Sequence, residues 1–402
     1  MLTSVRIICV IRILLNRMWY NAGIRTTILL RKGYRMQYEY KAEKDREARL
    51  KSEELMSHLP YYVRTYIAGR EARMSSRTRL VYLRRIDTFF DYLIDTQRFI
   101  RYGGYATDKA DITLQDLGTL TLEDIEAFAS WIRSRRITAH PGKAMDSEKE
   151  TTVNNYLSAL STFFRYFESH GKITKNPVAG YERKRLTKHP VVRLNTRQKS
   201  EFLDNVQSGE ALSEHQKAYH TKNALRDYAI CLTLTRTGLR VSELVGLNVR
   251  DMELDDCCFY VLRKGNKEDR VFFDDETASV LTEYLEYRKT LLVDPTEQAL
   301  FLNTFGKYKG TRLSVRSVEK LVKKYATTGA PSTRGKITPH KLRATYATDM
   351  LMATHDISLV QKVLNHESPQ TTMVYADQRT IDLEKARNVL KETGSEENKE
   401  KN

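Results

Sequence analysis

Residues 338–377 read TPHKLRATYATDMLMATHDISLVQKVLNHESPQTTMVYAD and carry the signals of three consecutive helices. Thr338-Pro339 combines a good N-cap with a proline at the first helical position, where its missing N–H costs nothing. This first helix is expected to end near His355. Two shorter helices are expected over 359–364, capped by Ser358, and from Ser368. Helical spacing predicts a buried face on the first helix, formed by Leu342, Tyr346, Met350 and Ala353.

Helix packing leaves four polar side chains of this stretch unexplained: His340, Arg343, His366 and Tyr375. An arginine fork pairs two phosphate oxygens at once. A tyrosine hydroxyl becomes a nucleophile when a neighbour takes its proton. The set therefore favours phosphoryl transfer. The chain has 23 Tyr and 9 His, however, so any single one is more often a core or surface residue, and the interpretation needs support from elsewhere in the chain.

The charge of the chain points to a polyanionic partner. Its 402 residues are enough for two domains, and 67 Lys and Arg against 51 Asp and Glu give a net charge of +16. Residues 1–36 contribute +7 of this, which leaves the remainder at +9. Because the body is basic without its N-terminal segment, nucleic acid is the expected partner.

Cysteine usage predicts a reducing, cytoplasmic location. Neither a disulfide framework nor a CxxC zinc pair is formed by Cys9, Cys231, Cys257 and Cys258. The apolar segment 5–15 is interrupted by Arg6 and Arg12 and is shorter than the ~20 residues of a membrane span, so no membrane association is expected. Residues 1–35 are expected to be dispensable, with Met36 as the natural start, which mass spectrometry of the native protein would test.

Five segments are expected along the chain: a basic N-terminal extension with a charged lead-in (1–49), a helical DNA-binding domain (50–172), a basic linker (173–195), a catalytic domain (196–391) and a charged tail (392–402). The helical domain should contain four helices. They are expected over about 52–68 with a break at Pro60, from Ser75, from Thr121 to about 135, and over about 150–169.

Two helices of the first domain carry clustered arginines: Arg77, Arg79, Arg84 and Arg85 on one, and Arg133, Arg135 and Arg136 on the other. A solvated face is the ordinary interpretation of such charge. A phosphate-facing surface is the alternative, and the basic character of the whole chain supports it.

The second domain mixes helices with a hairpin. A helix over 222–238 ends at Gly238, and Arg240 follows directly after this turn. Residues 259–273 predict two strands around a turn that contains Lys264. Helices are expected over 275–291 and 315–327. The fold class is therefore mainly α with a small antiparallel β-sheet (α+β).

Six residues now stand in order, in the motifs TGLRVSELVGL, RKGNKE, TPHKLRATYAT and LNHESPQTTMVY: Arg240, Lys264, His340, Arg343, His366 and Tyr375. With these motifs the sequence resembles the tyrosine recombinases, or phage integrase family, and most nearly its Xer-type members. The resemblance covers about 190–390 and, more loosely, the helical half, which looks like the core-binding domain of that family. Two positions depart from the usual pattern: Ala344 replaces a frequent histidine and Asn365 a frequent glycine, which puts the rate in question rather than the identity.

The resemblance implies a site-specific DNA recombinase. Arg240, Arg343 and His366 would hold the phosphate, and Tyr375 would attack it while His340 takes the proton. Lys264 would protonate the leaving 5′-oxygen. The 3′-phosphotyrosyl product conserves the bond energy, so rejoining needs no ATP, and neither a cofactor nor a metal is expected.

Double-stranded DNA sites are the implied partners. Four protomers, identical or with a second recombinase, would join two sites, and the helix expected over 380–391 would pack on a neighbour. Resolution of chromosome dimers is favoured because no extra arm-binding domain is evident. The alternatives are an integrase, excisionase or invertase of a mobile element, a relaxing topoisomerase, and a non-catalytic DNA-binding protein such as a repressor. The complete set of six residues argues against the last.

Overall fold

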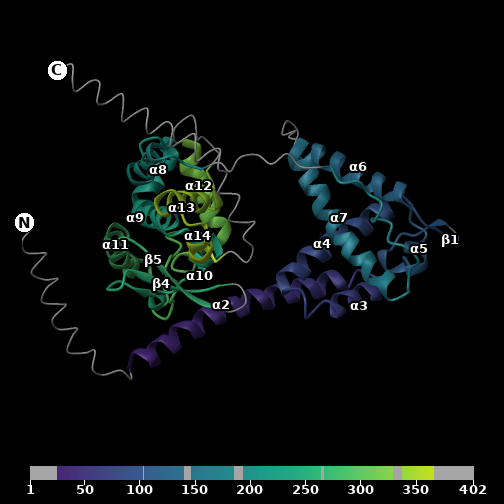
Figure 1. Cartoon of the computed structure of the whole chain (residues 1–402), viewed down its shortest axis with the longest axis horizontal. Helices are drawn as coiled ribbons and strands as arrows, with labels where there is room; N and C mark the ends of the chain where they lie inside the picture. The colour runs from purple at the N-terminus through teal and green to yellow at the C-terminus, as the bar shows by residue number, and fades with distance from the viewer. Residues whose placement is uncertain are drawn as a thin grey trace, which may run out of the picture. The chain divides into compact units, whose positions relative to one another are not determined.

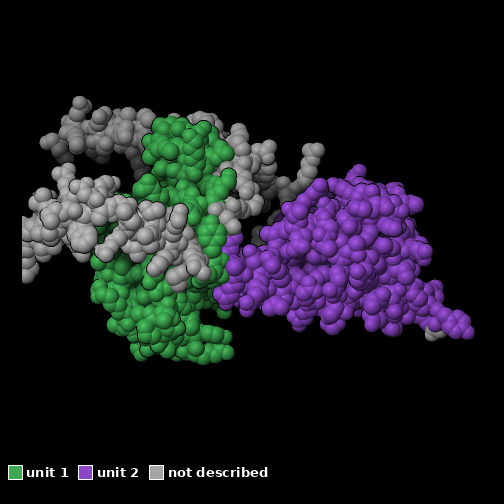
Figure 2. All heavy atoms as spheres, turned by 90° about the horizontal axis from the view of Figure 1, so that it is seen from below, with its two compact units in different colours: residues 1–40, 190–402 green, residues 41–189 purple. Residues whose placement is uncertain are grey.

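The computed structural model describes residues 25–102, 104–139, 146–184, 193–263, 267–328 and 337–365. In this part of the chain, helices dominate and the strands form one two-stranded and one three-stranded antiparallel sheet (Figure 1). The expected fold class is therefore confirmed. The chain divides into two compact units, one of residues 1–40 and 190–402 and one of residues 41–189 (Figure 2).

The unit of residues 41–189 is a bundle of helices. Helix α2 (Arg25–Met56) enters it at Lys41. The other helices are α3 (Tyr61–Gly69), α4 (Ser76–Asp95), α5 (Leu114–Gly118), α6 (Leu122–Ala139) and α7 (Asp146–Ser169). The break at Pro60 and the Ser75 cap are confirmed, because Pro60 precedes α3 and the Ser75 hydroxyl accepts from the backbone N–H of Thr78.

Aromatic packing holds the bundle together. Helices α4, α6 and α7 contact one another, and their rings meet edge to face around Phe89, which lies 5.0 Å from Phe128 and 6.1 Å from Phe164 between ring centroids. All three rings are fully buried. Such aromatic pairs add to the hydrophobic stabilisation of a core.

The connection between α4 and α6 has more structure than its sequence predicts. It contains the short hairpin β1 (Ile100–Arg101) and β2 (Gly104–Tyr105), the 3-10 turn η1 (Lys109–Asp111) and helix α5. Helices α6 and α7 both also extend further into the polar loop between them than the sequence predicts.

The other unit is built around a central helix. Helix α9 packs against α8, α11 and α13 in the core of this unit. The helices are α8 (Thr196–Ser208), α9 (Glu214–Thr237), α10 (Val241–Gly246), α11 (Asp275–Leu291), α12 (Val315–Thr328), α13 (Pro339–Thr354) and α14 (Ile357–Leu364). Helix α9 begins eight residues earlier than its apolar pattern predicts, because Ser213 caps it.

A three-stranded sheet lies beside these helices. Its order is β3 (Met252–Glu253), β4 (Cys258–Leu262) and β5 (Glu268–Phe272), all antiparallel. The hairpin of β4 and β5 is confirmed, with Leu262 paired to Glu268, whereas β3 was not predicted. The expected turn with Lys264 falls on residues 264–266, which lie outside the described residues.

Helices α13 and α14 follow the sequence closely. The Thr338 side chain accepts from the backbone N–H of Lys341, Pro339 occupies the first position of α13, and His355 ends it in the left-handed conformation. Two details differ: Asp356 caps α14, and Ala353 is exposed rather than buried. The third helix expected from Ser368 lies outside the described residues.

Candidate active site

A left-handed glycine brings Arg240 to the candidate site. Gly238 ends α9 with φ 61°, a conformation that glycine adopts without steric cost. The chain then turns so that Arg240 stands at the N-terminus of α10, where its side chain keeps about 39% of its surface exposed. Arg240 is therefore an accessible cation at the junction of two helices.

Gly238→Ala is expected to lower the free energy of unfolding by about 2–4 kcal/mol, from left-handed strain and overpacking together. An added Cβ would lie 2.4 Å from Cδ1 of Tyr346. Urea unfolding measures the loss. Gly246→Ala is the matched control, since its Cβ meets only Tyr40 Cδ1 at 3.9 Å, and it should be neutral or stabilise by up to about 1 kcal/mol. Equal free energies of unfolding for Gly238→Ala and Gly246→Ala would contradict this explanation of Gly238.

Arg343 is the buried counterpart of Arg240. It lies one turn into α13 and is only 2% exposed. Its two terminal nitrogens donate to the carbonyls of Gly238 and Leu364, at the C-terminal ends of α9 and α14. Carbonyls at a helix C-terminus carry partial negative charge, so both helix ends stabilise this guanidinium and fix its plane.

Asn365 occupies a position that suits glycine or asparagine. It ends α14 with φ 47°, and its carbonyl accepts from Arg240 Nη2 at 3.3 Å. Asparagine tolerates the left-handed conformation better than other non-glycine residues, which explains how it replaces the glycine usual in the family. Ala344, the other departure, is buried and packs with Leu351 and Val360.

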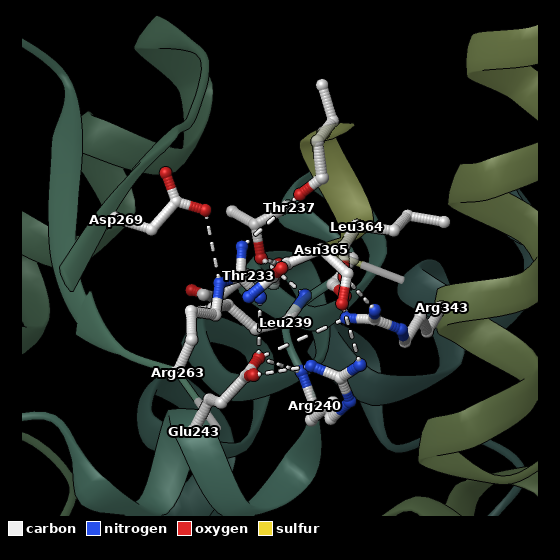
Figure 3. A network of polar contacts seen from close by, with 12 residues as sticks. Thr233, Thr237, Leu239, Arg240, Glu243, Arg263, Asp269, Arg343, Leu364 and Asn365 are labelled. Carbon is white, nitrogen blue, oxygen red and sulfur yellow. Dashed lines mark hydrogen bonds and ion pairs between the residues drawn. The ribbon is translucent and has the colours of Figure 1, made fainter. Parts of the chain in front are cut away.

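One carboxylate joins three arginines. Glu243 contacts Arg240 at 2.8 Å, Arg263 at 3.0 Å and Arg343 at 4.0 Å, measured from carboxylate oxygen to guanidinium nitrogen. Figure 3 shows Glu243 with Arg263 on one side and Arg240 and Arg343 on the other. We call these four residues the arginine cluster. Burial opposes the charge of Glu243, yet Arg263 and then Arg240 bring the pKa of its carboxyl below the ordinary value.

The sequence also contained a signal for Arg263 that was missed. Phe259, Val261 and Arg263 alternate along β4 and its end, and all three are buried. Alternate strand residues face the same side, so an arginine that continues an apolar inward face is unusual. The motif RKGNKE points instead to the next residue, Lys264.

His340 lies in the first turn of α13, close enough to Arg343 and Arg240 for their charges to act on its ring. Although the residue keeps an exposed surface, partial burial of its ring lowers its pKa from the ordinary 6.5, and the positive charges of Arg343 and then Arg240 lower it further. Neutral imidazole accepts a proton, so this environment suits a general base at neutral pH.

In the role that the resemblance to the tyrosine recombinases implies for it, His340 should make strand cleavage depend on pH. A base works when deprotonated, so the cleavage rate should rise with pH through a midpoint below 6.5 and be level at neutral pH. Single-turnover cleavage between about pH 5 and 8 measures this limb. His340→Gln should cleave slowly, and its cleavage rate should not rise with pH over this range. A wild-type midpoint at or above the ordinary histidine value would contradict the assignment.

The structure thus brings Arg240, His340 and Arg343 together, whereas Lys264, His366 and Tyr375 lie outside the described residues. Within the described ranges, no group of three or more His, Cys, Asp or Glu side chains is placed to hold a metal ion. No helix in the described part of the chain has the length and apolar character needed to cross a membrane.

Known proteins resemble this chain along most of its length. The phage integrase family model matches residues 201–380. Tyrosine recombinase XerS of Lactococcus lactis subsp. cremoris (strain MG1363) is 30% identical over 357 residues, which cover 82% of this chain and 95% of that protein. XerS of Streptococcus uberis (strain ATCC BAA-854 / 0140J) is 33% identical over 346 residues, covering 81% and 94%.

Solved structures share the fold. The Tn1549 transposon integrase in complex with circular intermediate DNA superposes with a TM-score of 0.52 at 20% identity, over 78% of this chain and 94% of that one. A lambda integrase dimer bound to a COC′ core site gives a TM-score of 0.52 at 17% identity, over 79% and 76%. At these identities the likeness concerns the fold alone.

Proposed function

Because the chain belongs to the phage integrase family of tyrosine recombinases, we propose that it is a site-specific DNA recombinase that cuts and rejoins strands through a 3′-phosphotyrosyl intermediate. The arginine cluster carries this proposal. Two guanidiniums, Arg240 and Arg343, are held by one carboxylate beside a histidine of lowered pKa. Paired arginines are suited to the charge that develops on phosphate oxygens during attack.

The proposed reaction is an in-line transfer. The Tyr375 hydroxyl attacks phosphorus and gives its proton to His340, while the bond to the 5′-oxygen breaks and Lys264 protonates that oxygen. Arg240, Arg343 and His366 stabilise the phosphate. Rejoining reverses these steps, so atoms and protons balance without ATP, a metal or another cofactor.

Arg343 has to change partners for this role. In the structure its terminal nitrogens donate to Gly238 and Leu364, and Arg240 donates to the neighbouring Asn365 carbonyl. A phosphate held by both arginines would replace part of these carbonyl bonds. We therefore infer that DNA binding shifts the end of α14, directly before His366.

DNA contact by the other unit is proposed for its exposed arginines. On α4, Arg77 and Arg84 are exposed. Arg79 instead pairs with Glu71 at 2.8 Å, and Arg133 pairs with Glu150 at 2.8 Å, so these two are structural. Phosphate contacts of this kind would position the duplex rather than read its sequence.

We infer a complex of four protomers on two DNA sites, homomeric or with a second recombinase. The thiols of Cys231, Cys257 and Cys258 are free, which fits the reducing cytoplasm.

Similarity to XerS over nearly all of that protein's length favours resolution of chromosome dimers. The likeness to a transposon integrase, which would favour a mobile-element role, rests on the fold alone.

The polarity of a trapped intermediate tests the proposed reaction. Sites are selected from fragmented genomic DNA with the purified protein and rebuilt as suicide substrates nicked next to the cleavage point. The wild-type protein should retain the strand that ends in a 3′-phosphate and release a fragment with a 5′-hydroxyl. An adduct through a 5′-phosphate, or no adduct on any selected site, would refute the function.

A further inference from the structure

Arg263 is a buried cation that the proposed reaction does not use. It follows β4, is 2% exposed and continues the inward face formed by Phe259 and Val261. Arginine is almost never fully buried unless it is paired. Burial of its guanidinium at the end of a hairpin is therefore costly unless bonded partners compensate for the lost water.

Each side-chain nitrogen of Arg263 donates to a different acceptor. Nη1 lies 3.0 Å from the Glu243 carboxylate, Nε lies 3.3 Å from the Asp269 carboxylate, and Nη2 lies 3.2 Å from the Val363 carbonyl. These acceptors belong to α10, β5 and α14. A planar guanidinium fixes three directions at once, which a lysine ammonium on a flexible stem does not. Arg263 thus connects both strands of the hairpin to the arginine cluster and to the end of α14.

The backbone of Arg263 closes the hairpin as well. Its N–H donates to the carbonyl of Lys267 at 2.7 Å, so the residues on either side of 264–266 are bonded to each other. Lys264 is the next residue along the chain. The residue that precedes it, Arg263, is therefore held by one backbone bond and three side-chain bonds.

We propose that Arg263 is a positioning residue for the general acid: its bonds fix the backbone that leads into Lys264 relative to Glu243 and Arg240, so that the ammonium reaches the leaving 5′-oxygen. This inference rests on the proposed function, in which Lys264 is the acid. The shared Glu243 couples the acid to the phosphate-binding arginines, and the bond to Val363 couples it to the segment that precedes His366.

A change of leaving group separates this role from simple stabilisation of the fold. An alkoxide is about as basic as hydroxide and needs a proton to leave. A thiolate has a conjugate acid pKa of about 8.5 and leaves without one. A substrate with sulfur in place of the bridging 5′-oxygen therefore does not need the acid, while attack by Tyr375 and loss of its proton are unchanged.

The test compares single-turnover cleavage of matched oxygen and sulfur substrates by the full-length protein. Arg263→Lys keeps a cation beside Glu243, so it should fold more readily than Arg263→Met. Arg263→Met removes all three side-chain bonds. Lys264→Ala is the reference for loss of the acid. Arg270→Met, on the exposed face of β5, is the matched control for loss of a hairpin arginine.

Arg263→Lys and Arg263→Met should slow cleavage of the oxygen substrate by about 10- to 100-fold, part of the 10²–10⁴ that a general acid contributes. On the sulfur substrate, the cleavage rates of both Arg263 variants should approach the wild-type rate, as that of Lys264→Ala should. The rate of Arg270→Met relative to wild type should be the same on both substrates. Equal defects on both substrates would overturn the inference and leave Arg263 purely structural. If Lys264→Ala itself gains nothing from sulfur, the acid assignment fails and this inference fails with it, while a wild-type adduct would still support the recombinase.

Discussion

Arg343→Lys is expected to lower the single-turnover cleavage rate by about 10²–10³, the usual effect of losing one donor to a developing oxyanion. Arg343 is held in one plane by two carbonyls from different helix ends. Lysine keeps the charge but offers no planar fork, so it cannot contact both carbonyls and then present paired donors to a phosphate. Quenched cleavage assays on suicide substrates measure the rate.

A second buried arginine provides the control for this prediction. Arg288 is buried and donates to the carbonyls of Ala299 at 2.8 Å and Glu297 at 2.7 Å, away from the arginine cluster. Arg288→Lys should reduce stability but leave the cleavage rate of the folded protein within about threefold, since it touches neither nucleophile nor phosphate. Similar cleavage rates for both variants would show that Arg343 only stabilises the fold.

Glu243→Gln is expected to destabilise the unit of residues 1–40 and 190–402 by about 3 kcal/mol or more, because removing one member of a buried ion pair leaves the other uncompensated. Here three guanidiniums lose their shared carboxylate. For a unit of this size the change corresponds to roughly 6–12 °C in Tm. Thermal unfolding followed by circular dichroism measures it.

The pH dependence of stability gives Glu243 a second signature. The folded-state pKa of its carboxyl is lowered, so its contribution is fully present above the ordinary value of 4.5 and is lost as the pH falls through the lower folded value. The exposed pair of Glu286 and Lys289 is the control. Glu286→Gln should cost at most about 0.5 kcal/mol. A comparably small loss for Glu243→Gln would contradict the account of the cluster.

Local signals predicted the helices that position the site. The side chains of Thr338 and Ser75 accept bonds from backbone N–H groups three residues on, and Pro339 suits the first helical position by its own ring, so their effects can be predicted from sequence. Gly238 and Arg240 were likewise placed correctly beside a helix end. Boundaries were less accurate where a cap such as Asp356 or Ser213 lies outside the apolar pattern.

Contacts between residues that are far apart along the chain could not be predicted from these local signals. The bonds from Arg343 to Gly238 and Leu364 join residues that are distant along the chain. Arg79 and Arg133 carry the same charge as Arg77, yet their partners Glu71 and Glu150 remove them from the set available to DNA. Which arginine is structural depends on which acid lies within reach, and that follows only from the fold.

The most direct test of the mechanism concerns Tyr375, the proposed nucleophile. Wild-type protein and Tyr375→Phe are incubated with the same nicked suicide substrate, after binding of both to the site has been shown to be equal. The wild type should form a covalent protein–DNA adduct that survives denaturation, and peptide mapping should place the DNA on Tyr375. Tyr375→Phe should form none, because phenylalanine lacks the attacking oxygen. An adduct that persists in Tyr375→Phe, or maps to another residue, would contradict the assignment.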